Sequence, residues 1–290
     1  MVPSAPLSIP RLVAIAIAAE GLLTLMDALI KLVSARYPIL QVAFLRYVFG
    51  LIGAIVYACW RPPGWPTRES ALFNGLRAVL ITFVATAFFF ALARLPLADT
   101  IALSFISPVL VAVFGVLILG ERLDWRILVA LAGGIAGMLL IVGGGLGSTE
   151  LTTDVLLGAG AVVLSAIGYA FTIILLRHRA TRDPLSQIVL FQNLGPVIIL
   201  AIPALWVWTP LPFADYALFA LIGTLGVAAH TMLAHAFARI EAARLAPVAY
   251  MTLAWGVLFG FILFAEIPGL ATLAGAALIV VATLVSQRRV

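Results

Sequence analysis

The chain has 290 residues, of which 64% are hydrophobic and only 10% carry a charge. Its mean hydropathy of +1.21 excludes a water-soluble globular domain. The hydrophobic runs each last about 20 residues, which is long enough for a helix to cross a hydrocarbon core of roughly 30 Å. The composition therefore predicts an all-α membrane protein.

A single cysteine, Cys59, excludes a disulfide framework and a cysteine-based metal site. Basic residues outnumber acidic ones by 17 to 12, but they lie singly or in pairs between the apolar runs. We therefore expect contact with the lipid bilayer, no nucleic acid partner and no cofactor or metal.

Prolines, glycines and charge clusters divide the chain into ten predicted membrane spans. These cover residues 11–33, 38–60, 70–94, 97–119, 126–146, 155–177, 185–208, 213–237, 242–264 and 268–286. With the N-terminus inside, only Lys31, Arg36 and Arg94 fall in outer loops, whereas Arg46 and Arg77 lie within or at the edge of spans and the other twelve basic residues face the cytoplasm. This bias predicts a multi-pass protein with both termini cytoplasmic.

The second half of the sequence repeats the first. A shift of 145 residues aligns Ala93–Glu121 with Ala238–Glu266, and a shift of 146 aligns Pro38 with Pro184. The identical polar pairs are Arg94 with Arg239, Glu121 with Glu266 and Gln41 with Gln187. Because five spans is an odd number, the halves must enter the membrane in opposite orientations. The sequence predicts two inverted five-helix repeats, residues 1–147 and 148–290, an arrangement typical of alternating-access transporters.

Three ionisable residues interrupt the first span. Glu20, Thr24, Asp27 and Lys31 are spaced so that they share one face of a helix. Each ionised group at mid-bilayer costs about 2.5–3.5 kcal/mol, so this face is predicted to look at protein or water. Asp27 and Lys31 are expected to form an ion pair near the outer surface. Glu20 lies deeper without a partner in its own helix, which favours its protonation near neutral pH.

Other spans supply polar groups predicted to line the same cavity and bind substrate together with Glu20, Thr24 and Asp27. These are Arg46, Arg77, Tyr169, His230, Tyr250 and Trp255. An alternative stays open, in which Arg46 and Arg77 pair with the two acids to hold helices together, and Tyr250 and Trp255 serve packing. His230 and His235 lie about 140° apart around a helix, so a zinc site is not expected.

Five segments resemble the drug/metabolite transporter superfamily, and within it the ten-span proteins built from two EamA domains. They read "LMDALIK", "FLRYVFG", "LRAVLI", "LADTIALSFISPVLVAVFGVLILGERLDW" and "EAARLAPVAYMTLAWGVLFGFILFAEIPG". The series of charges is similar to that of S-adenosylmethionine transporters. The resemblance implies a bacterial inner-membrane protein with cytoplasmic termini, a central cavity and alternating access, driven by exchange or by protons.

Glu20 is similar in position to the membrane carboxylate in the first span of the four-span multidrug exporters of this superfamily, which binds a cation or a proton competitively. This chain departs from them by adding Arg46 and Arg77, which favour a substrate that also carries a carboxylate.

The sequence thus predicts a secondary active transporter of a small zwitterionic or cationic metabolite, such as an amino acid or S-adenosylmethionine, in a monomer or dimer. Coupling to protons and exchange for a counter-substrate are both open. The alternative is a membrane-embedded enzyme acting on a lipid or isoprenoid substrate, for which "GERLDW" is a poor metal motif. Charged groups of both signs inside the spans disfavour a passive channel.

Overall fold

The computed structural model describes residues 9–92, 94, 100, 103–104, 106–122, 124–143, 153–264 and 270–287. Helices make up nearly all of this part of the chain, which confirms the all-α prediction. They are α1 (Ile9–Ser34), α2 (Ile39–Trp60), α3 (Arg68–Leu92), α5 (Ile106–Leu119), α6 (Trp125–Gly143), α7 (Thr153–Ala180), α8 (Leu185–Trp206), α9 (Phe213–Phe237), α10 (Ala242–Leu245), the 3-10 helix η1 (Ala246–Tyr250), α11 (Met251–Phe264) and α12 (Leu270–Gln287).

Length and composition fit these helices to a membrane. Within the described ranges, seven segments are long and apolar enough to cross a bilayer, and three shorter apolar helices accompany them. Together they correspond to the ten predicted spans. The beginning of the fourth span, at 97–102, lies mostly outside the described residues.

Prolines set several helix boundaries. Helices α2 and α8 begin directly after Pro38 and Pro184, where a residue without a backbone N–H costs the helix nothing. The ninth span is broken, because Pro247 falls in η1 between α10 and α11. Irregular backbone at membrane depth is tolerated where it is buried in protein, and η1 is almost entirely buried.

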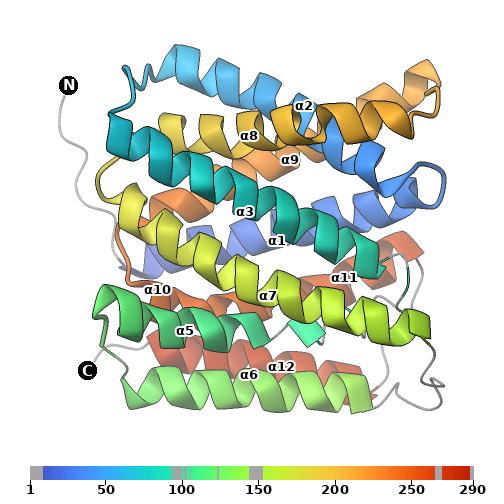
Figure 1. The fold of residues 1–290 in the computed structure, drawn as a ribbon. Coiled ribbons are helices and arrows are strands. Elements are labelled where there is room, and N and C mark those ends of the chain that lie inside the picture. The colour runs from blue at the N-terminus through green and yellow to red at the C-terminus, as the bar shows by residue number, and fades with distance from the viewer. Residues whose placement is uncertain are drawn as a thin grey trace.

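The helix contacts are preserved when each helix is exchanged for its counterpart in the other half. α1 packs on α9 and α11, as its counterpart α7 packs on α3 and α5; α2 packs on α9 as α8 packs on α3. α2 pairs with its counterpart α8, and α6 with its counterpart α12. In Figure 1, α1 and α7 run in opposite directions, as do α2 and α8. These relations support the inverted repeat.

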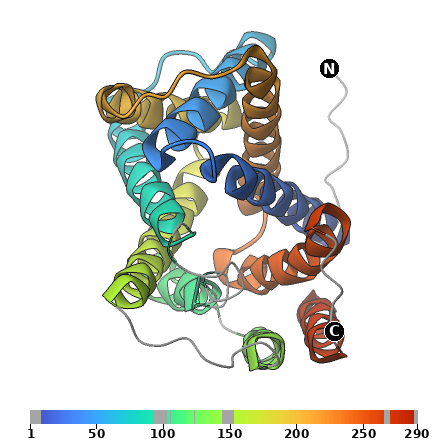
Figure 2. The same ribbon diagram turned by 90° about the vertical axis from the view of Figure 1, so that its right-hand side faces the viewer.

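Figure 1 also defines two ends of the bundle. We call the end at which α1 begins and α12 ends the terminal end, and the opposite end the far end. Figure 2 looks along the bundle and shows most helices arranged as a ring, with α6 and α12 beside each other outside it.

Equivalent ion pairs mark the two ends. Arg36 and Asp215 join the α1–α2 turn to the start of α9 at 3.2 Å. Arg182 and Glu69 join the α7–α8 turn to the start of α3 at 3.6 Å. Each residue of one pair lies 146 positions from its counterpart in the other. The repeat therefore extends to individual contacts, one at the far end and one at the terminal end.

Close helix crossings depend on small residues. A Cβ on Gly223 of α9 would lie 2.6 Å from the backbone nitrogen of Gly50 and 2.7 Å from the carbonyl carbon of Phe49. Because these neighbours are backbone atoms of α2, they cannot rotate away. The α2–α9 crossing, which holds one wall of the site described below, thus requires glycine at this position.

The Gly223→Ala variant should lower the free energy of unfolding by about 1–2 kcal/mol, because the added methyl forces α2 and α9 apart. The matched control is Gly75→Ala on α3, where a Cβ would meet no atom of a described residue within 4 Å. Thermal unfolding of both purified variants in detergent checks this. A melting temperature for Gly223→Ala equal to that of Gly75→Ala would contradict the close crossing.

Candidate functional site

A cavity of ≈ 220 Å³ lies between the two halves of the chain. Its walls come from α1, α2, α3, α5, α7, α8, α9, η1 and α11. The polar residues that line it are Glu20, Asp27, Arg46, Tyr47, Arg77, Ser104, Ser107, Tyr169, Thr172, Gln192, His230 and Thr252. The remaining walls are aliphatic and aromatic, so the cavity combines apolar surface with a few oriented polar groups, as small-molecule sites do.

Two carboxylates enter the cavity from α1. The carboxylate of Glu20 accepts a hydrogen bond from Thr252 Oγ1 of α11 at 3.1 Å, so it bridges the two halves. Asp27 lines the cavity two turns further along. Among the ion pairs of the described residues there is none between Asp27 and Lys31. Asp27 belongs to the cavity group in this conformation.

Two arginines face the cavity from α2 and α3, and they differ in their partners. Arg77 donates from Nη2 to Gln192 Oε1 at 2.8 Å and from Nε to the Thr172 carbonyl at 3.3 Å. Arg46 is only 7% exposed, and its Nε meets the weakly accepting sulfur of Met26 at 3.2 Å. Its Nη1 is buried and has no hydrogen-bond partner among the residues that the structure describes. Arg46 is therefore the arginine with unused donor capacity.

The charges are distributed unequally between the halves. Among the described residues, the charged groups that line the cavity are Glu20, Asp27, Arg46 and Arg77; all four come from the first half, and none of them forms an ion pair there. The second half contributes neutral hydrogen-bonding groups such as Gln192. Within the described residues, this conformation therefore shows no direct ion pair between the two arginines and the two acids, which the alternative interpretation of the sequence had predicted.

His230 on α9 has a fixed orientation. Its Nδ1 lies 2.7 Å from the Gly226 carbonyl oxygen. Since a carbonyl only accepts, Nδ1 carries the hydrogen, and in the neutral ring Nε2 is left as an acceptor. The ring lines the cavity with Arg46, so His230 supplies an acceptor on the same wall.

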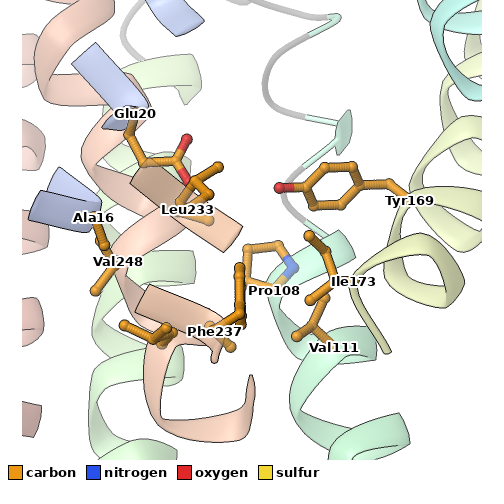
Figure 3. A pocket seen from close by; sticks show the side chains of 12 residues that line it. Ala16, Glu20, Pro108, Val111, Tyr169, Ile173, Leu233, Phe237 and Val248 are labelled. Atoms are coloured by element: carbon orange, nitrogen blue, oxygen red, sulfur yellow. The ribbon is translucent and has the colours of Figure 1, made fainter. Parts of the chain in front are cut away.

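A second cavity of only ≈ 20 Å³ adjoins the first toward the terminal end and shares Glu20 and Tyr169 with it; we call this second cavity the passage. Figure 3 shows Glu20 and Tyr169 at its mouth, with the tyrosine hydroxyl directed across the passage toward the carboxylate. Beyond them Pro108, Phe237 and Val248 close in from three elements. Glu20 thus lies where a polar cavity meets an apolar constriction.

A carboxylate connects the two halves at the terminal end, behind this constriction. Glu121 follows α5, and its Oε1 and Oε2 accept hydrogen bonds from the backbone N–H groups of Ala242 (2.9 Å) and Ala243 (2.8 Å). Arg177 Nε lies 3.4 Å from the same carboxylate, while its Nη1 donates to the Phe237 carbonyl at 2.6 Å. Glu121 therefore ties the first half to the backbone of the second.

A second polar cluster joins α3, α7 and α8 at the terminal end. Asp183 accepts hydrogen bonds from Arg179 Nε (2.8 Å), Ser70 Oγ (2.8 Å) and Asn74 Nδ2 (2.7 Å). Burial alone raises the pKa of Asp183, but these hydrogen bonds and the Arg179 charge outweigh it and hold the pKa below its usual range. Arg179 also pairs with Glu69 at 2.8 Å.

The Asp183→Asn variant should lower the free energy of unfolding at pH 7 by about 1.5 kcal/mol, because a charge-assisted bond to Arg179 is lost. A carboxyl with a lowered folded pKa contributes its full stability above the unfolded pKa of about 3.9 and loses it as the pH falls through the folded value. The melting-temperature gap between wild type and variant should therefore stay constant from pH 7 to 5 and shrink below about pH 4.

Asp124→Asn, at an exposed position of the same end, is the control for this series. The role given to Asp183 is contradicted if the wild type and Asp183→Asn have the same melting temperature at pH 7. It is also contradicted if the difference between their melting temperatures grows as the pH falls.

Not every predicted site residue reaches the cavity. The structure brings Glu20, Asp27, Arg46, Arg77, Tyr169 and His230 together along its walls. Thr24 instead donates to the Glu20 carbonyl within α1 at 2.7 Å. Tyr250 is fully buried in the core, with its ring against Gly134. Their role as substrate ligands has no geometric support in this conformation.

Trp255 also has a structural position here. Its Nε1 donates to the Ile17 carbonyl at 2.9 Å, its ring lies against Gly21, and it stacks on Phe259 with centroids 5.9 Å apart. The side chain therefore fixes α1 against α11 and does not line the cavity.

Some cavity residues were not among the predicted substrate ligands. Tyr47 follows Arg46 directly and places its ring 4.4 Å from the arginine guanidinium. Gln192 and Thr172 hold Arg77, and Thr252 holds Glu20. Uncharged polar residues are common in membrane helices, so their composition gives little signal. The residues that hydrogen-bond to a buried charged side chain can be identified only once the positions of the helices are known.

Known proteins are similar to this chain over nearly all its length. The EamA-like transporter family matches it twice, at residues 12–143 and 156–287. The pseudopaline exporter CntI of Pseudomonas aeruginosa is 28% identical over 283 residues, which cover 95% of each chain. The S-adenosylmethionine uptake transporter of Rickettsia bellii is 22% identical and aligns over 89% of this chain and 87% of its own.

A solved crystal structure has a similar fold, with a TM-score of 0.77 at 19% identity over 96% of this chain and 95% of its own. The fold, the repeat and the two sequence matches agree: the chain is a membrane transporter that belongs to the EamA-like transporter family.

Proposed function

We propose that this protein moves a small zwitterionic or cationic organic metabolite, an amino acid or a derivative of one, across the inner membrane by alternating access. The observation that carries the proposal is the central cavity with two carboxylates and two guanidiniums, none of them in a protein ion pair in the described chain. Such groups are costly at membrane depth and are stabilised when a ligand of opposite charge binds them.

The inverted repeat supports the mechanism. Two halves that pack around one site can rock against each other and expose the site to either side in turn. The small volume of the passage and the Glu121 contacts support a terminal end that is closed in this conformation. We place the terminal end in the cytoplasm, because the positive-inside distribution of the loops favours that orientation.

The similar transporters support a metabolite substrate, since their names concern pseudopaline and S-adenosylmethionine. One is named as an exporter and the other as an uptake transporter. The proposal for this chain therefore concerns the class of substrate and the mode of transport, and it leaves the direction of transport open. Exchange and proton coupling are both compatible with it.

Counterflow in proteoliposomes tests the proposal. Vesicles loaded with millimolar unlabelled amino acids or S-adenosylmethionine should transiently accumulate the same labelled compound from outside, with saturation. Protein-free vesicles give the leak. Flux that neither saturates nor produces a transient accumulation would indicate a passive pore and would contradict the proposal. Chemical turnover by the detergent-solubilised protein, with no compartment present, would instead support the membrane-enzyme alternative.

A further inference from the structure

We propose that the cavity recognises a dibasic amino acid, or a compound with the same three charges. Its carboxylate binds Arg46, its α-ammonium binds Asp27, and a second cationic group at the far end of its chain binds Glu20. This inference rests on the proposed transport function and narrows its substrate class.

The carboxylate position follows from the difference between the two arginines. Arg77 already donates to Gln192 and Thr172, and none of its nitrogens is among the buried polar atoms that lack a partner in the described chain. Arg46 has a buried Nη1 without a partner in the described part of the chain, and in a dry site such an unmet donor carries the full desolvation cost. A planar carboxylate satisfies a guanidinium edge through two parallel hydrogen bonds. Arg46 is therefore the carboxylate receptor.

The first cationic position lies beside Arg46. Asp27 follows Met26, whose sulfur lies 3.2 Å from Arg46 Nε, and Asp27 and Arg46 both line the cavity. An α-amino acid presents its ammonium and carboxylate on neighbouring atoms. The two charges of an amino-acid head thus match Asp27 and Arg46, and the acceptor side of His230 lies on the same wall.

The second cationic position is Glu20. It is seven residues before Asp27 on α1, which corresponds to about 10 Å along the helix axis. Between them Leu23 presents an aliphatic surface to the cavity. A carboxylate, an apolar stretch and a second carboxylate in line are complementary to a molecule with two cationic groups joined by methylenes.

Four ligands of nearly equal size allow the contribution of each of the three charges to binding to be measured separately. Lysine carries all of them. Norleucine lacks the side-chain ammonium, cadaverine lacks the carboxylate, and 6-aminohexanoate lacks the α-ammonium. Titration calorimetry with the purified full-length protein should give lysine at least tenfold tighter binding than each of the other three.

Two variants locate the charges. Arg46→Gln should weaken lysine binding at least tenfold and should not weaken cadaverine binding, since cadaverine has no carboxylate to lose. Glu20→Gln should weaken lysine at least tenfold and leave norleucine unchanged. The ligand whose binding is not weakened in each case also shows that the variant is folded.

The inference is overturned if norleucine or cadaverine binds as tightly as lysine, if lysine does not bind, or if Arg46→Gln weakens lysine and cadaverine equally. These outcomes are distinct from failure of the proposed function. Counterflow of a neutral amino acid would overturn the dibasic class while the transporter stands, whereas no saturable counterflow of any tested metabolite would remove both.

Discussion

Glu20→Gln should lower kcat/KM for a cationic substrate about 100-fold, a loss of about 2.7 kcal/mol in line with removal of one partner of a buried charge pair. Glutamine keeps the shape of the side chain, and its carbonyl still accepts the hydrogen bond from Thr252 Oγ1 that Glu20 receives at 3.1 Å. The fold is therefore expected to survive, and the change removes the ionisable group from the mouth of the passage.

The pH profile gives a second readout of Glu20. In the wild type a proton and the cationic group of the substrate compete for the same carboxylate, so transport should rise with pH as the carboxyl loses its proton. Glutamine does not titrate, so the part of the pH dependence that comes from Glu20 should be lost in the variant, and only the part that comes from Asp27 should remain. Initial rates in proteoliposomes from pH 5.5 to 8.5 measure both effects.

Glu69→Gln is the matched control, because Glu69 is a carboxylate at the terminal end with a 58% exposed side chain and lies away from the cavity walls. It should keep wild-type kinetics and pH dependence. Unchanged affinity together with an unchanged pH profile in Glu20→Gln would remove Glu20 from the mechanism.

Glu121→Gln should open the terminal end, with a shift of about 2 kcal/mol, or about 30-fold, in the opening equilibrium, because two charge-assisted bonds depend on this carboxylate. Both of its oxygens accept from backbone N–H groups, at Ala242 and Ala243. An amide puts an NH₂ group against one of these donors, and it no longer neutralises Arg177.

Hydrogen exchange measures this opening directly. The amides of Ala242 and Ala243 should exchange about 30-fold faster in Glu121→Gln, while those in the middle of α2 stay protected. Glu241→Gln is the control, since Glu241 is exposed and immediately precedes the same two residues. Equal exchange rates in Glu121→Gln and the wild type would show that the carboxylate does not hold this end.

Most of the fold could be predicted from the sequence because lipid imposes simple rules on the chain. Helix α9 covers the predicted span 213–237, and α2 begins one residue after the predicted start at 38. Every backbone group in the hydrocarbon must bond within the helix, so hydrophobic length locates the spans. The break at η1 could not be placed, because Pro247 alone does not distinguish a kinked helix from an interrupted one.

The charged members of the site could also be predicted, since Glu20, Asp27, Arg46 and Arg77 are rare residue types for a membrane helix. Their partners could not. Glu121 was visible only as an acid near a loop, and its contacts at Ala242 and Ala243 are more than 120 residues away in sequence. Tyr250 and Trp255 have the same residue types as ligand-binding aromatics, and only packing distinguishes the two roles.

The central claim is that one cavity between the halves is reached from both sides of the membrane in turn and is occupied by the substrate. Ser107 lines this cavity, and replacing Cys59, the single native cysteine, by serine leaves Ser107→Cys as the only thiol. A membrane-impermeant maleimide should label this thiol in both right-side-out and inside-out vesicles, and transported substrate should slow labelling from each side. Labelling from one side only, or labelling that saturating substrate does not change, would contradict the account.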